Sequence, residues 1–154
     1  FRRVLFRSKD IFYMQKALSE AKYAFEKDEI PVGAVIVSND KIIARSHNLT
    51  QMLNDVTAHA EMQAITSAAN HLGNKYLSEC TLYVTLEPCQ MCAGAIYWTQ
   101  LDRLVYGAND NHRGYKVLGT NLHPKTKVKS GVLSKECKLI VDAFFIKKRK
   151  EKAH

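Results

Sequence analysis

The sequence predicts an α/β protein in which helices cover both faces of a mixed five-stranded sheet. Short runs rich in β-branched residues alternate along the chain with segments whose apolar residues recur at helical spacing. This alternation is typical of a sheet packed between helices. With 154 residues and a hydrophobic content of 46%, the chain has the length of one domain and enough apolar side chains for a sizeable core.

The first part of the chain predicts a helix followed by a β-hairpin. Apolar residues at helical spacing indicate a helix over residues 9–27, which ends before Ile30-Pro31 because the residue before a proline disfavours helical backbone. Apolar, β-branched runs over 32–37 and 41–45 predict two strands. Ser38-Asn39-Asp40 between them is typical of a tight turn.

The middle of the chain predicts a helix and a buried strand. Residues 46–56 are polar and irregular, and Thr57 is a suitable first residue for a helix that runs to about His71. Gly73 would close this helix. The apolar run over 81–86 predicts a strand buried on both faces.

The last part predicts two helices and two strands. A helix over 89–100 is followed by a strand over 103–107, a loop over 109–124, an edge strand over 125–130 and a final helix over 134–149. We expect the apolar side of the final helix to hold three residues: Leu139, Ala143 and Ile146.

Residues 1–8 fit none of these elements, so we predict a disordered or non-native extension ahead of one domain over 9–154. No stretch approaches the roughly 20 apolar residues of a membrane helix, and we expect no membrane partner. The formal net charge of +8 favours an anionic partner such as nucleic acid. The candidates for RNA backbone contacts lie together near the C-terminus: Lys147, Lys148, Arg149 and Lys150.

Two short motifs contain the candidate functional residues. One is His59-Ala60-Glu61, and the other is Pro88-Cys89-Gln90-Met91-Cys92. Cysteine thiolate and neutral imidazole are the usual protein ligands of zinc, and three of them leave the fourth tetrahedral position open for water. We therefore predict one zinc ion (Zn2+) per chain, bound by His59, Cys89 and Cys92. Zinc in such a site lowers the pKa of its water to about 7.

Glu61 could stand beside that water and act as general acid and base. Residues two apart in mid-helix point about 200° away from each other, so His59 and Glu61 can converge only in the first turn. Thr57 as the helix-start residue would place them there. The two cysteines would share the first turn of the next helix, where the partial positive charge favours thiolate. A structural zinc would need a fourth ligand, and Cys80, the nearest candidate, precedes a strand that separates it from the motif.

The pair of motifs resembles the signature of the zinc-dependent cytidine and adenosine deaminases. The likeness to the bacterial tRNA-specific adenosine deaminases covers roughly residues 10–149. It is carried by Glu29-Ile30-Pro31-Val32-Gly33-Ala34-Val35, Asn48, Thr57-Ala58-His59-Ala60-Glu61 and residues 81–96. The resemblance implies the cytidine-deaminase-like three-layer α/β/α sandwich, a cytoplasmic protein and a homodimer. Tyr97 and Trp98 would offer apolar surface for such a contact.

The resemblance also implies hydrolytic conversion of adenosine to inosine at the wobble position of a tRNA anticodon stem-loop. Glu61 would move protons from water to the base and to the leaving ammonia. Asn48 would read the edge of the base, and the backbone N–H of Ala60 would face it. Asp110 would be a further substrate-binding residue, and Glu87 would support the site without taking part in the chemistry.

Some departures from the family pattern leave the substrate open. Asn109 stands where an arginine is typical, the loop over 111–124 is shorter than expected, and Ile146 replaces a basic residue. One alternative is a deaminase of free bases or nucleosides such as guanine, cytosine or cytidine. Another is a catalytically silent zinc-containing RNA-binding module, against which the intact Glu61 argues.

Overall fold

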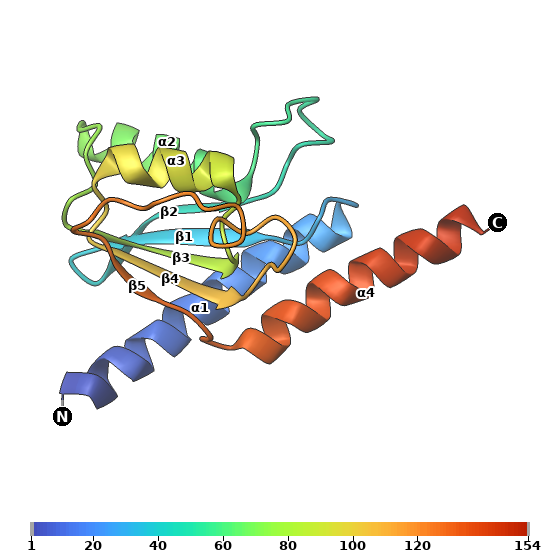
Figure 1. Ribbon diagram of the computed structural model, residues 1–154, viewed down its shortest axis with the longest axis horizontal. Coiled ribbons are helices and arrows are strands. Elements are labelled where there is room, and N and C mark those ends of the chain that lie inside the picture. The colour runs from blue at the N-terminus through green and yellow to red at the C-terminus, as the bar shows by residue number, and fades with distance from the viewer. Residues whose placement is uncertain (1, 154) are drawn as a thin grey trace.

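The chain alternates helices and strands in the order that the sequence predicts. In the computed structural model, residues 2–153 are described (Figure 1). The elements are α1 (Arg2–Glu26), β1 (Gly33–Ser38), β2 (Lys41–His47), α2 (Ala60–Leu72), β3 (Cys80–Leu86), α3 (Gln90–Thr99), β4 (Arg103–Ala108), β5 (Lys127–Lys129) and α4 (Ser134–Lys152). Among the described helices, none combines the length and apolar character needed to cross a bilayer.

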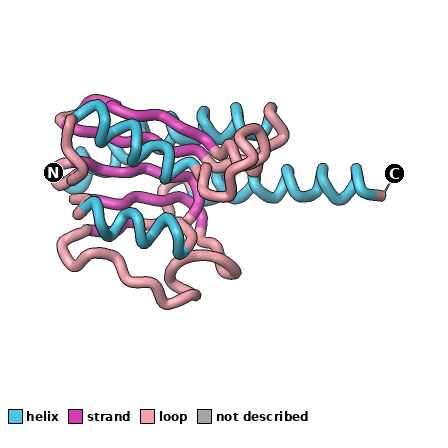
Figure 2. The backbone as a smooth tube through the Cα atoms, turned by 90° about the horizontal axis from the view of Figure 1, so that it is seen from above, coloured by secondary structure: helices cyan, strands magenta, loops and turns pink. Residues whose placement is uncertain are grey.

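The five strands form one mixed sheet in the order β2-β1-β3-β4-β5. β1 is antiparallel to both β2 and β3, whereas β4 is parallel to both β3 and β5. Helices α2 and α3 lie on one face of this sheet, and α1 and α4 lie on the other (Figures 1 and 2). The predicted fold class, a three-layer α/β/α sandwich with five strands, is confirmed.

Each central strand supplies both cores, because successive side chains of a strand point to opposite faces. In β1, Ala34 and Ile36 pack beneath α2 and α3, whereas Val35 packs against α1. In β4, Tyr106 belongs to the first core and Val105 to the second. Covering both faces with helices explains why these strands appear in the sequence as nearly continuous apolar runs.

The start of α2 differs from the prediction. The helix begins at Ala60 and not at Thr57, and its N-cap is His59, whose backbone is extended at φ −70° and ψ 155°. Thr57 instead belongs to a turn, since its N–H and its hydroxyl both donate to the Asp55 carboxylate at 2.8 and 2.7 Å. A side chain–backbone bond of this kind competes with helix formation. Gly73 closes the helix in the left-handed region, at φ 64°, as predicted.

The apolar side predicted for α4 was wrong. Leu139 and Ile146 are 66% and 46% exposed. The buried residues of this helix are Cys137 and Phe144. Apolar residues occur around much of α4, so their spacing alone does not indicate which side of the helix is buried. The side that carries Phe144 is buried because it packs against α1, where the Phe144 ring lies 5.9 Å from the ring of Phe25.

Residues 2–8 of the predicted extension continue α1 as further helical turns. Residues 3–8 are exposed on this part of the helix, and the Phe6 ring lies 5.2 Å from the Arg103 guanidinium. β5 has the predicted edge position but contains only three residues, Lys127–Lys129.

A buried carboxylate joins α1 to three strands. Asp10 is 0% exposed and accepts two hydrogen bonds from Arg103, at 3.1 and 3.0 Å, and one from Lys129 at 3.2 Å. The Tyr83 hydroxyl also donates to it at 2.8 Å. Burial by itself would raise the pKa of Asp10, but the bonds from Arg103 and Tyr83 outweigh burial and hold this pKa below its ordinary value of 3.8. Asp10 therefore acts as an ionised anchor for the layer opposite the candidate site.

Candidate metal centre

Three side chains from two separate segments converge on one point. His59 Nδ1 lies 3.6 Å from Cys89 Sγ and 3.5 Å from Cys92 Sγ, and the three ligand atoms all lie within 4.8 Å of one another. A tetrahedral zinc with ordinary bond lengths would place nitrogen and sulfur ligands about 3.6 Å apart. The donor set and its spacing therefore fit zinc, and the three residues predicted as metal ligands are the ones brought together.

Two helix starts create this convergence. His59 is the N-cap of α2, and Cys89 is the N-cap of α3 with φ −72° and ψ 174°. Cys92 lies in the first turn of α3. Both helices begin beside the end of β3 (Figure 1), and their unpaired N–H groups give this edge of the sheet a partial positive charge. The extended backbone at each cap turns the side chain out of the helical spiral and toward the other motif.

A hydrogen bond between the two cysteine side chains shifts their pKa values in opposite directions. The hydrogen bond with Cys92, reinforced by one with His59, lowers the pKa of Cys89 to about 4 in spite of burial. The same bond with Cys89, together with burial, raises the pKa of the Cys92 thiol. The hydrogen bond with Cys89 also raises the pKa of His59. Binding of a divalent cation would displace the protons held by the two thiols and the imidazole, as is general for thiolate and imidazole sites.

Glu61 lies in the first turn of α2, beside the ligands. It is 4% exposed, and burial raises its pKa to about 7. A carboxyl group whose pKa lies near neutrality can both take up and release a proton. The position and the pKa of Glu61 thus suit the proton-carrying role predicted for it.

A cavity of about 840 Å³ opens beside these groups, a size within the range of small-molecule sites. Asn48, Ala60 and Asp110, the three predicted substrate-binding residues, all line it. The sequence interpretation missed the contribution of α4, which supplies Lys138, Val141, Asp142 and Phe145 to the wall. Their spacing is that of one helical face, but the sequence gives no sign of which face meets the cavity.

Asn48 is suited to meet a ligand. It is 6% exposed, and its side-chain Oδ1 is buried without a hydrogen-bond partner. Its backbone N–H donates to the Val32 carbonyl at 3.1 Å, which fixes the residue at the cavity wall. A buried acceptor without a partner is costly, and a donor on a bound molecule would satisfy it.

Glu87 holds the loop that carries Asp110. Its buried carboxylate accepts the N–H of Asp110 at 3.1 Å and the N–H of Lys116 at 3.2 Å. Asp110 in turn accepts the N–H groups of His112 and Arg113 at 3.1 and 2.9 Å. The supporting role expected of Glu87 is therefore the shaping of this cavity wall.

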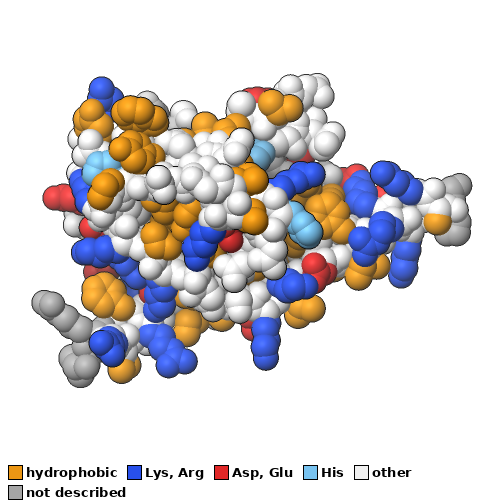
Figure 3. Space-filling model, viewed as in Figure 1, with side chains coloured by type: hydrophobic (Ala, Val, Ile, Leu, Met, Phe, Trp, Pro, Cys, Tyr) orange, Lys and Arg blue, Asp and Glu red, His pale blue; other side chains and the backbone are white. Residues whose placement is uncertain are grey.

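The α4 residues predicted to contact the RNA backbone do not line this cavity: Lys147, Lys148, Arg149 and Lys150. They lie on the part of the helix that extends beyond the sheet, where lysine and arginine side chains gather (Figure 3). Lys148 forms ion pairs with Asp28 and Glu151, and the Lys147 ammonium lies 5.4 Å from the centre of the Phe25 ring.

Comparison with known proteins agrees with this site. The chain matches the family described as the cytidine and deoxycytidylate deaminase zinc-binding region over residues 7–108, and it belongs to that family. Both motifs lie within the matched residues, so the chain is a zinc-dependent hydrolytic deaminase, as predicted.

The chain is also similar to individual proteins of known sequence and structure. The tRNA-specific adenosine deaminase of Bacillus subtilis (strain 168) is 45% identical over 151 residues, which cover 94% of each chain. A structure from a study of A-to-I editing by tRNA:A34 deaminases at the wobble position of transfer RNA is 44% identical, with a TM-score of 0.79. The match covers 84% of this chain and 98% of that one. A guanine deaminase structure from Bacillus subtilis is 37% identical, with a TM-score of 0.61, and covers 70% of this chain and 66% of its own.

Proposed function

We propose that this deaminase converts adenosine to inosine at the wobble position of tRNA anticodons. The observation that carries the proposal is the identity of 45% with a tRNA-specific adenosine deaminase over 94% of both chains. The cavity supports the proposal, because the residues expected to act on the base all line it: Asn48, Ala60, Glu61 and Asp110. This substrate would place the enzyme in the cytoplasm.

The chemistry follows from the groups at the site. His59, Cys89 and Cys92 would hold zinc, which supplies a Lewis acid that lowers the pKa of a water to about 7. The water oxygen forms a bond to C6 of the adenine ring, while Glu61 accepts a proton from that water and delivers it to the ring nitrogen next to C6. It then carries the second proton to the exocyclic amine, which leaves as ammonia. One water is consumed, and the carbonyl of inosine is formed.

Two groups would orient the base. Asn48 Oδ1 is free to accept a hydrogen bond from the base edge. The backbone N–H of Ala60 is the first of α2 and has no partner within the helix, so it can donate to the base. Asp110 would contact the substrate from the loop on another side of the cavity.

Two further features belong to this proposal. Lys147, Lys148, Arg149 and Lys150 would contact the RNA backbone, because phosphate contacts need only cations in the right place. Two copies of the chain would form a homodimer through α3, where Trp98 is 76% exposed beside Tyr97.

An assay of the purified zinc enzyme tests the proposal. Anticodon stem-loops would be compared with a panel of free bases and nucleosides under identical conditions. Turnover of an adenosine-containing stem-loop far above any small substrate supports the proposal. The likeness to a guanine deaminase at 37% identity favours a second candidate, deamination of a free base, which faster turnover of guanine would establish.

A further inference from the structure

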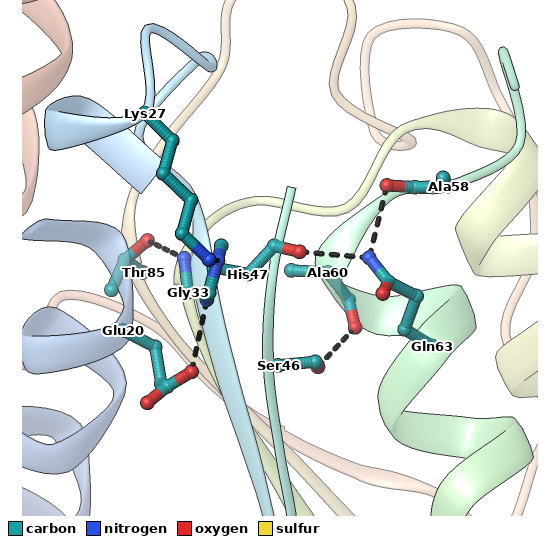
Figure 4. A network of polar contacts seen from close by, with 9 residues as sticks. All are labelled: Glu20, Lys27, Gly33, Ser46, His47, Ala58, Ala60, Gln63 and Thr85. Carbon is teal, nitrogen blue, oxygen red and sulfur yellow. Dashed lines mark hydrogen bonds and ion pairs between the residues drawn. The ribbon is translucent and has the colours of Figure 1, made fainter. Parts of the chain in front are cut away.

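Gln63, the fourth residue of α2, links the two stretches of backbone that carry the base-facing and metal-ligating side chains (Figure 4). Its Nε2 donates to the His47 carbonyl at 2.7 Å and to the Ala58 carbonyl at 3.1 Å. A primary amide has two N–H groups, so both donors are used. His47 directly precedes Asn48, and Ala58 directly precedes His59.

These bonds close a loop at its base. Residues 49–57 leave the end of β2 and return to α2 as a largely exposed excursion (Figure 1). Besides the amide, the base of the loop is held by the Leu49 N–H, which donates to the Ala58 carbonyl at 3.0 Å. The Ser46 hydroxyl donates to the Ala60 carbonyl at 2.6 Å (Figure 4). Within the loop, the buried Glu29 carboxylate accepts the N–H groups of Gln51 and Met52, each at 2.9 Å. The bonds at the base therefore fix the junction between β2 and α2, and Glu29 fixes the loop beyond it.

The other side of β2 is held independently. The His47 ring contacts the Glu20 carboxylate at 3.1 Å and the Lys27 ammonium at 3.2 Å (Figure 4). Loss of the Gln63 amide would therefore leave β2 attached to α1. It would also remove the bond between the His47 carbonyl and α2, the element that carries the reacting groups. The Ser46 hydroxyl and the Leu49 N–H would then be the remaining bonds across this junction.

We propose that Gln63 is a positioning residue that sets the distance between Asn48 and the reacting groups at the start of α2. This inference rests on the proposed role of Asn48 in orienting the base. Gln63 acts through Asn48 and touches neither substrate nor metal. An isosteric glutamate would offer acceptors to two carbonyl oxygens, and a methionine would offer no donor, so neither can replace the amide.

A double-mutant cycle with Gln63→Met and Asn48→Ala tests the inference. kcat and KM are measured on whichever substrate, stem-loop, nucleoside or base, the wild-type zinc enzyme turns over fastest. Gln63→Met alone is expected to lower kcat/KM by about 10- to 100-fold, the cost of misplacing a residue that orients the substrate, with zinc content unchanged. In the Asn48→Ala background the same change is expected to cost roughly threefold or less, because the positioned group is already absent.

Two further variants accompany the cycle, one that removes the same donors at constant shape and one matched control. Gln63→Glu removes both donors at constant shape and is expected to match or exceed the loss in Gln63→Met. Asn70→Met removes an exposed amide from the same helix and is expected to behave as the wild type. A loss from Gln63→Met that is equal in both backgrounds, or wild-type kinetics for both Gln63 variants, overturns the inference. Faster wild-type turnover of a free base would refute the proposed function, and the cycle would still decide the role of Gln63.

Discussion

His59 Nδ1 lies 3.5 Å from Cys92 Sγ, although 33 positions separate the two residues in the chain. Folding alone thus assembles a three-ligand site between the starts of α2 and α3. Nothing local in either motif produces this proximity; it depends on both helices beginning at the same edge of the sheet.

The first prediction follows from that geometry. The purified protein should contain one zinc per chain, and Cys92→Ala should contain well under one. The metal binds the folded chain and not the unfolded one, so chelation should lower Tm. Elemental analysis and thermal unfolding with and without chelator provide the measurements. Full zinc occupancy in Cys92→Ala would show that the ligand set is wrong.

Glu61→Ala should keep zinc and lose turnover. General acid–base catalysis contributes roughly 10²–10⁴-fold, and Glu61 serves several proton transfers, so the loss should reach the upper end of that range or exceed it. Glu61→Gln, which keeps the shape, should be equally inactive. Single-turnover rates at matched zinc content are the measurement, and a rate within tenfold of the wild type would refute the role.

Asp10→Asn should destabilise the fold without affecting the zinc site. Removing one partner of a buried ion pair costs about 3–5 kcal/mol, and we expect the lower end because Lys129 is 42% exposed. The pKa of Asp10 is depressed in the folded state. Its stabilisation is therefore present above its ordinary pKa of 3.8 and is lost as pH falls through the folded value.

Denaturant unfolding of wild type and Asp10→Asn at neutral pH and at about pH 3 checks this sign. The difference in free energy of unfolding should shrink in acid. A difference that grows as the pH falls would contradict the assignment of Asp10 as an ionised anchor.

Neutralising the basic cluster of α4 should weaken RNA binding without harming the cavity. The quadruple glutamine variant of Lys147, Lys148, Arg149 and Lys150 should bind every anticodon stem-loop less tightly. The salt dependence should become shallower by roughly 0.7–0.9 log units of slope for each lost contact. Binding titrations over a range of salt concentrations measure this. An unchanged slope would mean that this end of α4 is a solvated surface.

Trp98→Glu should shift a homodimer toward monomer. A charge in the centre of an apolar contact is repeated across a two-fold axis and is thus introduced twice. Light scattering at micromolar concentration is the measurement. A wild type that is monomeric under these conditions would contradict the dimer itself.

The sequence predicts the parts of this fold that depend on local pattern. Strands covered on both faces appear as apolar runs. A helix start and two metal ligands are both predicted by one motif, Pro88-Cys89-Gln90-Met91-Cys92. The start of α2 was misplaced because Thr57 looks like a cap, whereas Asp55 holds it in a turn. Such competition between two plausible partners is not visible in residue spacing.

Long-range polar contacts were the least predictable. Asp10 meets Arg103 across 93 positions, and no periodicity connects two such residues. Gln63 looks in the sequence like any polar residue on a helix surface. Its function emerges only when the end of β2 is placed against the start of α2.

The continuity of α4 has a consequence for the size of the substrate. One continuous helix carries Phe145 at the cavity wall and the cationic cluster beyond it. At 1.5 Å rise per residue, Lys150 lies about 7–8 Å further along the axis than Phe145. On the proposed function, a single nucleobase bound in the cavity would not extend to Lys150, whereas a polynucleotide would continue past it. This helix would therefore favour a polynucleotide over a single base, whatever the identity of the base.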